Sequence, residues 1–288
     1  MVFLVIIAGG VVRTTQSGMG CPDWPKCFGK WIPPTSANQL PIDFEKYLKQ
    51  QDIDHSFNVY HTWVEYINRL LGALLGVFIL IHTIWSYRLF FKQQPKIFWY
   101  SFVLLIAVGF QGWLGKKVVD ANLAVVKITL HMLVALIIAA IPVYIIHKAQ
   151  ANEKILQPSL KKIINLTLVL LLVQIILGTE VREQIDVIAK ANNYMHRNIW
   201  IASVNIYFKI HRSFSLIIAA LLVLLYIKNK KINIKKNTAL NNLVLVVGLI
   251  IVGVVMNYGN IPLIAQPLHL LLSAVLVINL FAYKLKFQ

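Results

Sequence analysis

The sequence predicts an all-α, polytopic membrane protein with eight transmembrane helices in two similar four-helix bundles. Three observations predict this class. The 288 residues are 58% hydrophobic and only 14% charged, whereas soluble domains carry about 25% charged residues. The apolar residues form long runs, and most charges lie between them. Several short motifs recur in the same order in the second half of the chain. This composition excludes a soluble enzyme and a disordered chain.

Seven apolar runs are long enough to cross the bilayer, which takes about 20 residues. An eighth run, roughly 1–12, is too short to cross unaided, so we expect a short or truncated first helix there. It has no basic segment before it, which argues against a signal peptide. The seven longer runs lie near 61–88, 97–115, 124–146, 161–180, 204–227, 239–258 and 266–283.

The charges predict the orientation. If the N-terminus is cytoplasmic, the segments on that side hold 14 basic residues against Glu153 alone, and the opposite segments hold 10 basic and 9 acidic residues. Lys and Arg collect in cytoplasmic loops. We therefore expect a multi-pass protein of the cell (inner) membrane, with both termini cytoplasmic and residues 13–60 outside. The net charge of +17 then reflects topology and contact with lipid. Because long apolar runs separate the basic residues, they form no continuous basic face for nucleic acid.

Three motif pairs indicate an internal repeat. Four spans separate equivalent motifs, so the two units share one orientation and form a parallel repeat. We expect an N-terminal unit over 1–147 and a C-terminal unit over 161–288, joined by a cytoplasmic linker at 148–160. The pairs are Ala8-Gly-Gly-Val-Val-Arg13 with Leu177-Gly-Thr-Glu-Val-Arg182, Ile67-Asn-Arg-Leu70 with Ile210-His-Arg-Ser213, and Leu130-His-Met-Leu133 with Leu268-His-Leu-Leu271.

The repeat places four polar residues at one depth. Asn68 corresponds to His211, and His131 corresponds to His269. Each lies a few residues into a span that enters from the outer side, so all four lie in a shallow layer. Two imidazoles on facing helices can bind a haem iron from both sides. Hydrogen-bonded core histidines are the alternative, but the in-register repetition favours a haem between His211 and His269.

Charges at membrane depth are functional candidates by default. Glu65 and Arg69 share a helix face at i,i+4 and could instead form a structural ion pair. His61 shares that face with Glu65 and Asn68, although it could simply be an interfacial residue. The remaining charges lie near span starts, where snorkelling is the alternative for the two lysines. They are Lys127, Lys209 and Arg212.

Both cysteines lie in the outer segment 13–60. Cys21 and Cys27 enclose five residues, including two prolines that favour a turn. An oxidising compartment permits a disulfide. So short a loop gains little stability from closure, which leaves local shaping, redox chemistry or a merely structural bond. A zinc site with loop histidines is a further alternative, but its ligand spacing is unrecognisable.

These features together resemble the haem A synthase family, membrane enzymes that convert haem O to haem A. The resemblance covers nearly the whole chain. Its most specific part runs from Gly9-Gly-Val-Val-Arg13 through Ser17-Gly-Met-Gly-Cys-Pro-Asp-Trp-Pro-Lys-Cys27. The other matching motifs are Glu65-Tyr-Ile-Asn-Arg69, Gln111-Gly-Trp-Leu-Gly115, Leu130-His131, His211-Arg212 and Pro267-Leu-His269.

The resemblance implies a haem b cofactor between His211 and His269. It implies that the N-terminal unit receives haem O through a Glu-x-x-His-Arg motif, matched by Glu65 and Arg69, and through a second histidine, matched by His131. It also implies a disulfide between the two cysteines of the outer loop.

One residue departs from that pattern, because Asn68 stands where the family motif has histidine. An amide is a poor iron ligand compared with imidazole. The substrate iron could bind His131 alone, His61 could replace the missing ligand, or the N-terminal site could have lost activity. We favour the first interpretation, because a substrate must come and go.

The implied reaction oxidises one methyl group of haem O to a formyl group, giving haem A for terminal oxidases, with electrons passing through haem b. Glu65 would act as a base or stabilise a developing cation. The haem propionates would pair with Arg69, Arg212 and Lys127. Haem O synthase and an electron acceptor would be partners in the membrane.

Two other functions share parts of this pattern. A quinone-linked electron-transfer subunit with bound haem b would need the histidine pair but neither Glu65 nor the cysteine loop. A non-catalytic haem-binding assembly factor would fit if Asn68 marks lost activity. Transport is disfavoured because no broken helices are paired between the halves.

Overall fold

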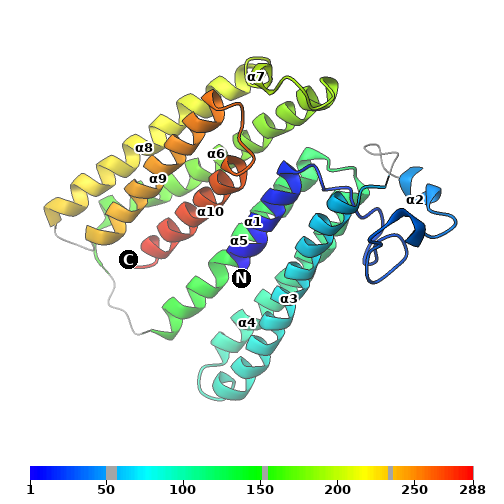
Figure 1. Ribbon diagram of the computed structural model, residues 1–288. Helices are drawn as coiled ribbons and strands as arrows, with labels where there is room; N and C mark the ends of the chain where they lie inside the picture. Colours follow the sequence, from blue (N-terminus) through cyan, green and yellow to red (C-terminus); the bar gives the residue numbers. More distant parts are fainter. Residues whose placement is uncertain (50–56, 151–154, 233–235, 288) are drawn as a thin grey trace. The chain divides into compact units, whose positions relative to one another are not determined.

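The computed structural model describes residues 1–49, 57–150, 155–232 and 236–287, and most of these residues are helical (Figure 1). The other residues, among them part of the predicted linker 148–160 and Glu153, lie outside this description. The helices are α1 (Val2–Thr14), η1 (Ala37–Gln39), α2 (Glu45–Lys49), α3 (Val59–Phe90), α4 (Pro95–Asp120), α5 (Val125–Ala149), α6 (Pro158–Ala191), α7 (Arg197–Trp200), α8 (Ile206–Ile232), α9 (Lys236–Tyr258) and α10 (Ala265–Lys284).

Seven of these helices are long and apolar enough to cross a membrane: α3, α4, α5, α6, α8, α9 and α10. The helix α1 is apolar but shorter. The predicted all-α, polytopic membrane class is confirmed, including the short first helix. The long spans follow from unbroken apolar runs, since only a helix satisfies its backbone hydrogen bonds within one segment in lipid.

The helix ends have local causes. Pro95 and Pro158 occupy the first turns of α4 and α6, where the missing N–H costs nothing and the fixed φ suits a helix. The Asn58 side chain caps α3 by accepting a hydrogen bond of 3.2 Å from the backbone N–H of His61.

Three asparagines end helices in the same way. Asn122, Asn193 and Asn260 each lie two residues beyond a helix end, after α4, α6 and α9, and each has a positive φ. Asparagine tolerates this left-handed conformation better than most residues. The chain therefore turns back at these points toward the next helix.

The described residues form two compact units, Met1–Ile138 and Ala139–Gln288, with the boundary inside α5. In the C-terminal unit, α6 and α9 each pack against both α8 and α10. Therefore α8 and α10 lie on opposite sides of a four-helix ring. In the N-terminal unit, α3 packs against α1 and α4 (Figure 1). The predicted division at 148–160 stays a prediction.

A loop after α1 is folded onto the first turns of α3. Cys21 and Cys27 form a disulfide with an S–S distance of 2.04 Å, and both are fully buried with Phe28. The Trp63 indole donates to the Pro34 carbonyl at 3.2 Å, and Tyr66 donates to the Trp31 carbonyl at 2.7 Å. We call residues 17–34 the disulfide loop. The predicted disulfide is confirmed, so these sulfurs are not thiolate ligands for zinc.

Gly20 lies where the disulfide loop comes closest to α3. A Cβ at this position would lie 2.3 Å from the His61 carbonyl oxygen and 2.6 Å from the Thr62 nitrogen. Both neighbours are backbone atoms of a helix and have no room to shift. Only glycine therefore fits here.

Replacing Gly20 with Ala should displace the disulfide loop from α3 and lower the free energy of unfolding by on the order of 1–3 kcal/mol, the usual cost of overpacking. Thermal unfolding in detergent measures this loss. Gly112→Ala is the matched control, since a Cβ there meets nothing within 4 Å. Equal stability of the two variants would contradict the close contact.

Candidate haem-binding site

The C-terminal unit holds His211 on α8 against α6. A Cβ added to Gly178 of α6 would lie 3.1 Å from Cε1 of His211. One turn earlier, the Gln174 side-chain amide donates to the His211 carbonyl at 2.9 Å. The glycine makes room for the imidazole, and the glutamine fixes the backbone that carries it.

His269 on α10 is placed in a similar way against α9. A Cβ on Gly253 would lie 3.8 Å from Cε1 of His269. The backbone of Leu249, one turn before this glycine, approaches the imidazole. The structure therefore places the two residues predicted as haem b ligands on opposite helices of the ring, with each imidazole facing a glycine of a neighbouring helix.

The N-terminal unit repeats this arrangement. The Gln111 side chain of α4 donates to the His131 carbonyl at 2.9 Å, and a Cβ on Gly115 would lie 3.3 Å from Cε1 of His131. On α3, Asn68 faces Gly9 of α1, whose Cβ would lie 4.0 Å from the Asn68 Oδ1 atom. Thus each of the four equivalent positions faces a glycine on a neighbouring helix.

Each of these four side chains also carries a buried polar atom without a regular hydrogen bond among the described residues. The atoms are Oδ1 of Asn68 and Nδ1 of His131, His211 and His269. Buried polar groups are normally paired. Four such atoms at equivalent places indicate a site shaped for a group that the protein itself does not supply.

The four glycines and two glutamines are site residues that the sequence reasoning missed. A signal for part of them was present, because Gln111 and Gln174 each precede a glycine by four residues. That spacing puts the amide and the glycine on one helix face. Only the structure shows that each pair faces a predicted iron ligand.

Glu65 lies one turn from Asn68 on α3, and its side chain is only 5% exposed. Its Oε2 atom accepts a hydrogen bond of 2.7 Å from the Cys21 backbone N–H, and its Oε1 atom accepts from Arg69. The predicted ion pair is present. Its partners also include the backbone of the disulfide loop, which the sequence did not predict.

The other predicted site residues lie at helix starts. His61 lies in the first turn of α3, with its ring 5.9 Å from that of Tyr60. Arg212 is exposed on α8, and its guanidinium lies 5.8 Å from the Phe208 ring centre. Lys127 is half-buried near the start of α5. No metal-binding group of three or more His, Cys, Asp or Glu residues occurs in the described ranges.

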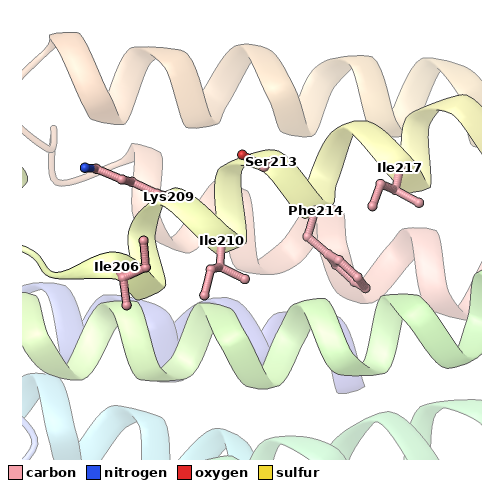
Figure 2. A pocket seen from close by; sticks show the side chains of 6 residues that line it. All are labelled: Ile206, Lys209, Ile210, Ser213, Phe214 and Ile217. Atoms are coloured by element: carbon pink, nitrogen blue, oxygen red, sulfur yellow. The ribbon is translucent and has the colours of Figure 1, made fainter.

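A shallow pocket lies along another face of α8 (Figure 2). Figure 2 shows Ile206, Ile210 and Phe214 on one side of the helix, with Lys209 extending away from them. The lining excludes His211 and Arg212. This face is therefore separate from the histidine site, and its apolar character suits contact with acyl chains. The pocket is lined by Ile206, Lys209, Ile210, Ser213, Phe214 and Ile217.

The chain is similar to known proteins of one family. A family model described as cytochrome oxidase assembly protein matches residues 1–281. The chain is 34% identical to the heme A synthase of Shewanella oneidensis over 130 residues. This matched segment makes up 45% of the chain and 37% of that relative. It is 27% identical to the heme A synthase of Bartonella quintana over 190 residues. This segment makes up 60% of the chain and 52% of that relative.

A third relative, the heme A synthase of Orientia tsutsugamushi strain Ikeda, is 32% identical over 124 residues, or 39% of the chain and 34% of that relative. The chain spans about half or less of the length of the curated relatives it matches. No solved structure matches it. Because the family model covers nearly all of the sequence, the chain belongs to the cytochrome oxidase assembly protein family that includes the haem A synthases.

Proposed function

We propose that this protein is a haem A synthase that oxidises a methyl group of haem O to a formyl group and so supplies haem A to terminal oxidases. The observation that carries the proposal is the repeated frame in which one amide and three imidazoles each face a glycine. The printed names of the relatives support the reaction.

His211 and His269 would hold a resident haem b in the C-terminal unit. They fit this group because they lie on opposite helices of the ring and each has a buried ring nitrogen, Nδ1, without a hydrogen-bond partner among the described residues. When bound, haem b supplies one-electron transfer between the substrate and an acceptor.

His131 and Asn68 would receive the substrate haem O in the N-terminal unit. His131 offers an imidazole to the substrate iron, whereas Asn68 offers only an amide oxygen, a weaker ligand for iron. A site with one strong ligand suits a substrate that binds, reacts and leaves. This difference between the units supports a resident group in the C-terminal unit and an exchanging group in the N-terminal one.

Glu65 acts on the substrate methyl group in this proposal, as a base or by stabilising a developing cation. Its buried carboxylate is held in one orientation by Cys21 and Arg69. Arg212 is exposed close to His211, so it is available to an anionic propionate. Lys127, at the start of α5, could serve the substrate haem in the same way.

The charge distribution supports an orientation with the disulfide loop outside the cell membrane and both termini in the cytoplasm. Haem O synthase and an electron acceptor are the partners that this reaction requires in the membrane. The acceptor takes the electrons that leave the methyl group. A quinone-linked haem b carrier is the second candidate, because it would use the same pair of His211 and His269.

Co-expression with a source of haem O tests the activity directly. We expect haem A in the extracted haems, identified by chromatography and mass. Glu65→Gln is the matched variant, and it should keep haem b while haem O stays unconverted. Haem b without any haem A from the unmodified chain would support the electron carrier instead.

Replacing His211 or His269 with Ala should abolish the low-spin haem b spectrum, because each change removes one axial imidazole. His131→Ala should keep that spectrum and lose substrate binding. His196→Ala is the control, since His196 lies outside the membrane helices, just before α7. A low-spin spectrum that survives in the double variant of His211 and His269 would overturn the ligand assignment.

Asn68→His should give the N-terminal unit a second strong iron ligand. On the side of Gly9 there is space for the change, since even a Cβ added to Gly9 would lie 4.0 Å from the Asn68 Oδ1 atom. We expect haem to dissociate at least about tenfold more slowly from this unit, which corresponds to about 1.4 kcal/mol of added binding. Stopped-flow transfer of haem to an acceptor protein measures the rate. Asn68→Gln keeps the amide, and haem should dissociate from this variant at the original rate. Equal rates of haem dissociation from the Asn68→His and Asn68→Gln variants would contradict the role of Asn68.

A further inference from the structure

The Arg69 guanidinium donates all of its hydrogen bonds to other groups of the protein. This group has five N–H donors in a fixed plane. Nε donates to Glu65 at 3.1 Å, and Nη1 donates to the carbonyls of Asp23 and Lys26 at 2.6 and 3.1 Å. Nη2 donates to the Cys21 carbonyl at 2.8 Å and to Glu65. All five donors are therefore engaged, three of them by the disulfide loop.

The surrounding residues of α3 bind the same loop. The Thr62 hydroxyl donates to the Gly20 carbonyl at 2.9 Å, and Glu65 accepts from the next backbone N–H, that of Cys21. Thr62, Glu65 and Arg69 lie at i, i+3 and i+7 and share one helix face. This face binds both ends of the Cys21–Cys27 segment, because Arg69 also reaches Asp23 and Lys26.

Arg212 gives an internal comparison. It occupies the position in the C-terminal unit that corresponds to Arg69, immediately after His211. Yet Arg212 is exposed and lies against a phenylalanine ring, whereas the Arg69 side chain is only 15% exposed. The two arginines are equivalent in sequence and differ in surroundings.

We propose that Arg69 is a positioning residue, which fixes the disulfide loop on α3 and holds Glu65 in place, and that it does not bind the substrate propionates. To bind a propionate, Arg69 would have to give up the part-buried contacts with the carbonyls of Cys21 and Asp23 or the exposed one with Lys26, and hydrogen bonds to a charged group are costly to lose. The part of this proposal that concerns substrate rests on the proposed function; the part that concerns the loop does not.

The geometry also predicts that lysine cannot replace Arg69. An ammonium group has three donors around one nitrogen and cannot span Glu65 and three separate carbonyls. Arg69→Lys should therefore behave like Arg69→Gln, although it keeps the charge. A propionate partner, in contrast, would be partly replaced by lysine.

The first test follows reduction of the Cys21–Cys27 disulfide in the full-length protein in detergent, without haem. A water-soluble phosphine reduces the bond, and maleimide labelling measures the rate. Arg69→Lys and Arg69→Gln should both be reduced about tenfold faster, because a loop that detaches more often is more accessible. Arg212→Lys is the matched control and should be reduced at the original rate. Equal rates for all the variants would overturn the proposal.

A milder variant covers the case in which the Arg69 variants do not accumulate. Thr62→Val keeps the shape of the side chain and removes the hydroxyl, which lies 2.9 Å from the carbonyl oxygens of both Gly20 in the loop and Asn58 in α3's own first turn. It should speed reduction by a smaller factor in the same direction. An unchanged reduction rate in this variant would count against the claim that α3 holds the disulfide loop in place.

The second test separates positioning from substrate contact. Haem O and its propionate dimethyl ester are compared as ligands of the original chain and of Arg69→Lys. If Arg69 acts on the loop, the substitution lowers binding of acid and ester by the same factor. If Arg69 binds propionates, the effect of the substitution disappears with the ester, which overturns the proposal. A chain that binds neither form refutes the proposed function, while the reduction rates still decide the role of Arg69.

Discussion

Both units share one packing constraint, in which a residue proposed as an iron ligand, or its equivalent Asn68, faces a glycine on the next helix. A Cβ at Gly178, Gly115 or Gly253 would lie 3.1–3.8 Å from the facing imidazole. Protein interiors are close-packed, so Gly178 and Gly115, where a Cβ would lie 3.1 and 3.3 Å from the facing ring, limit where that ring can lie. Small residues also let membrane helices associate closely. The same glycine therefore lets two helices approach and leaves the space that the facing imidazole occupies.

Under the proposed function, the two units use this shared frame for different tasks. The C-terminal unit has two imidazoles, and an apolar cluster that includes Val181, Trp200 and Ile261 forms near its α7 end. The N-terminal unit has one imidazole and one amide, and its corresponding segment is a disulfide loop bound to α3 by polar contacts. Two strong ligands suit a group that is retained. One strong ligand, beside a loop held by a few hydrogen bonds to Thr62, Glu65 and Arg69, suits a group that exchanges.

The sequence predicted the helices well for a physical reason, and the ligand positions stay a prediction. In a membrane, each span must be a continuous apolar run, and a charged or imidazole group inside it is conspicuous. The repeated motifs are enough to align Asn68 with His211. Pairwise contacts between distant segments were not predictable in this way. Nothing near Arg69 in the sequence indicates that its partners lie at Cys21, Asp23 and Lys26, because these contacts depend on how the loop folds back over α3. The i,i+4 pair with Glu65 was predictable, but its role in seating the loop was not.

The central claim, two equivalent frames with unequal ligands, is tested most directly by titrating the haem-free protein with haem b and recording electron paramagnetic resonance spectra. We predict that the first equivalent gives a low-spin signal typical of two imidazole ligands, from His211 and His269. The second equivalent should bind more weakly and give a different spectrum, from His131 and Asn68. Two equivalents with the same affinity and the same spectrum, or no low-spin signal at all, would contradict the account.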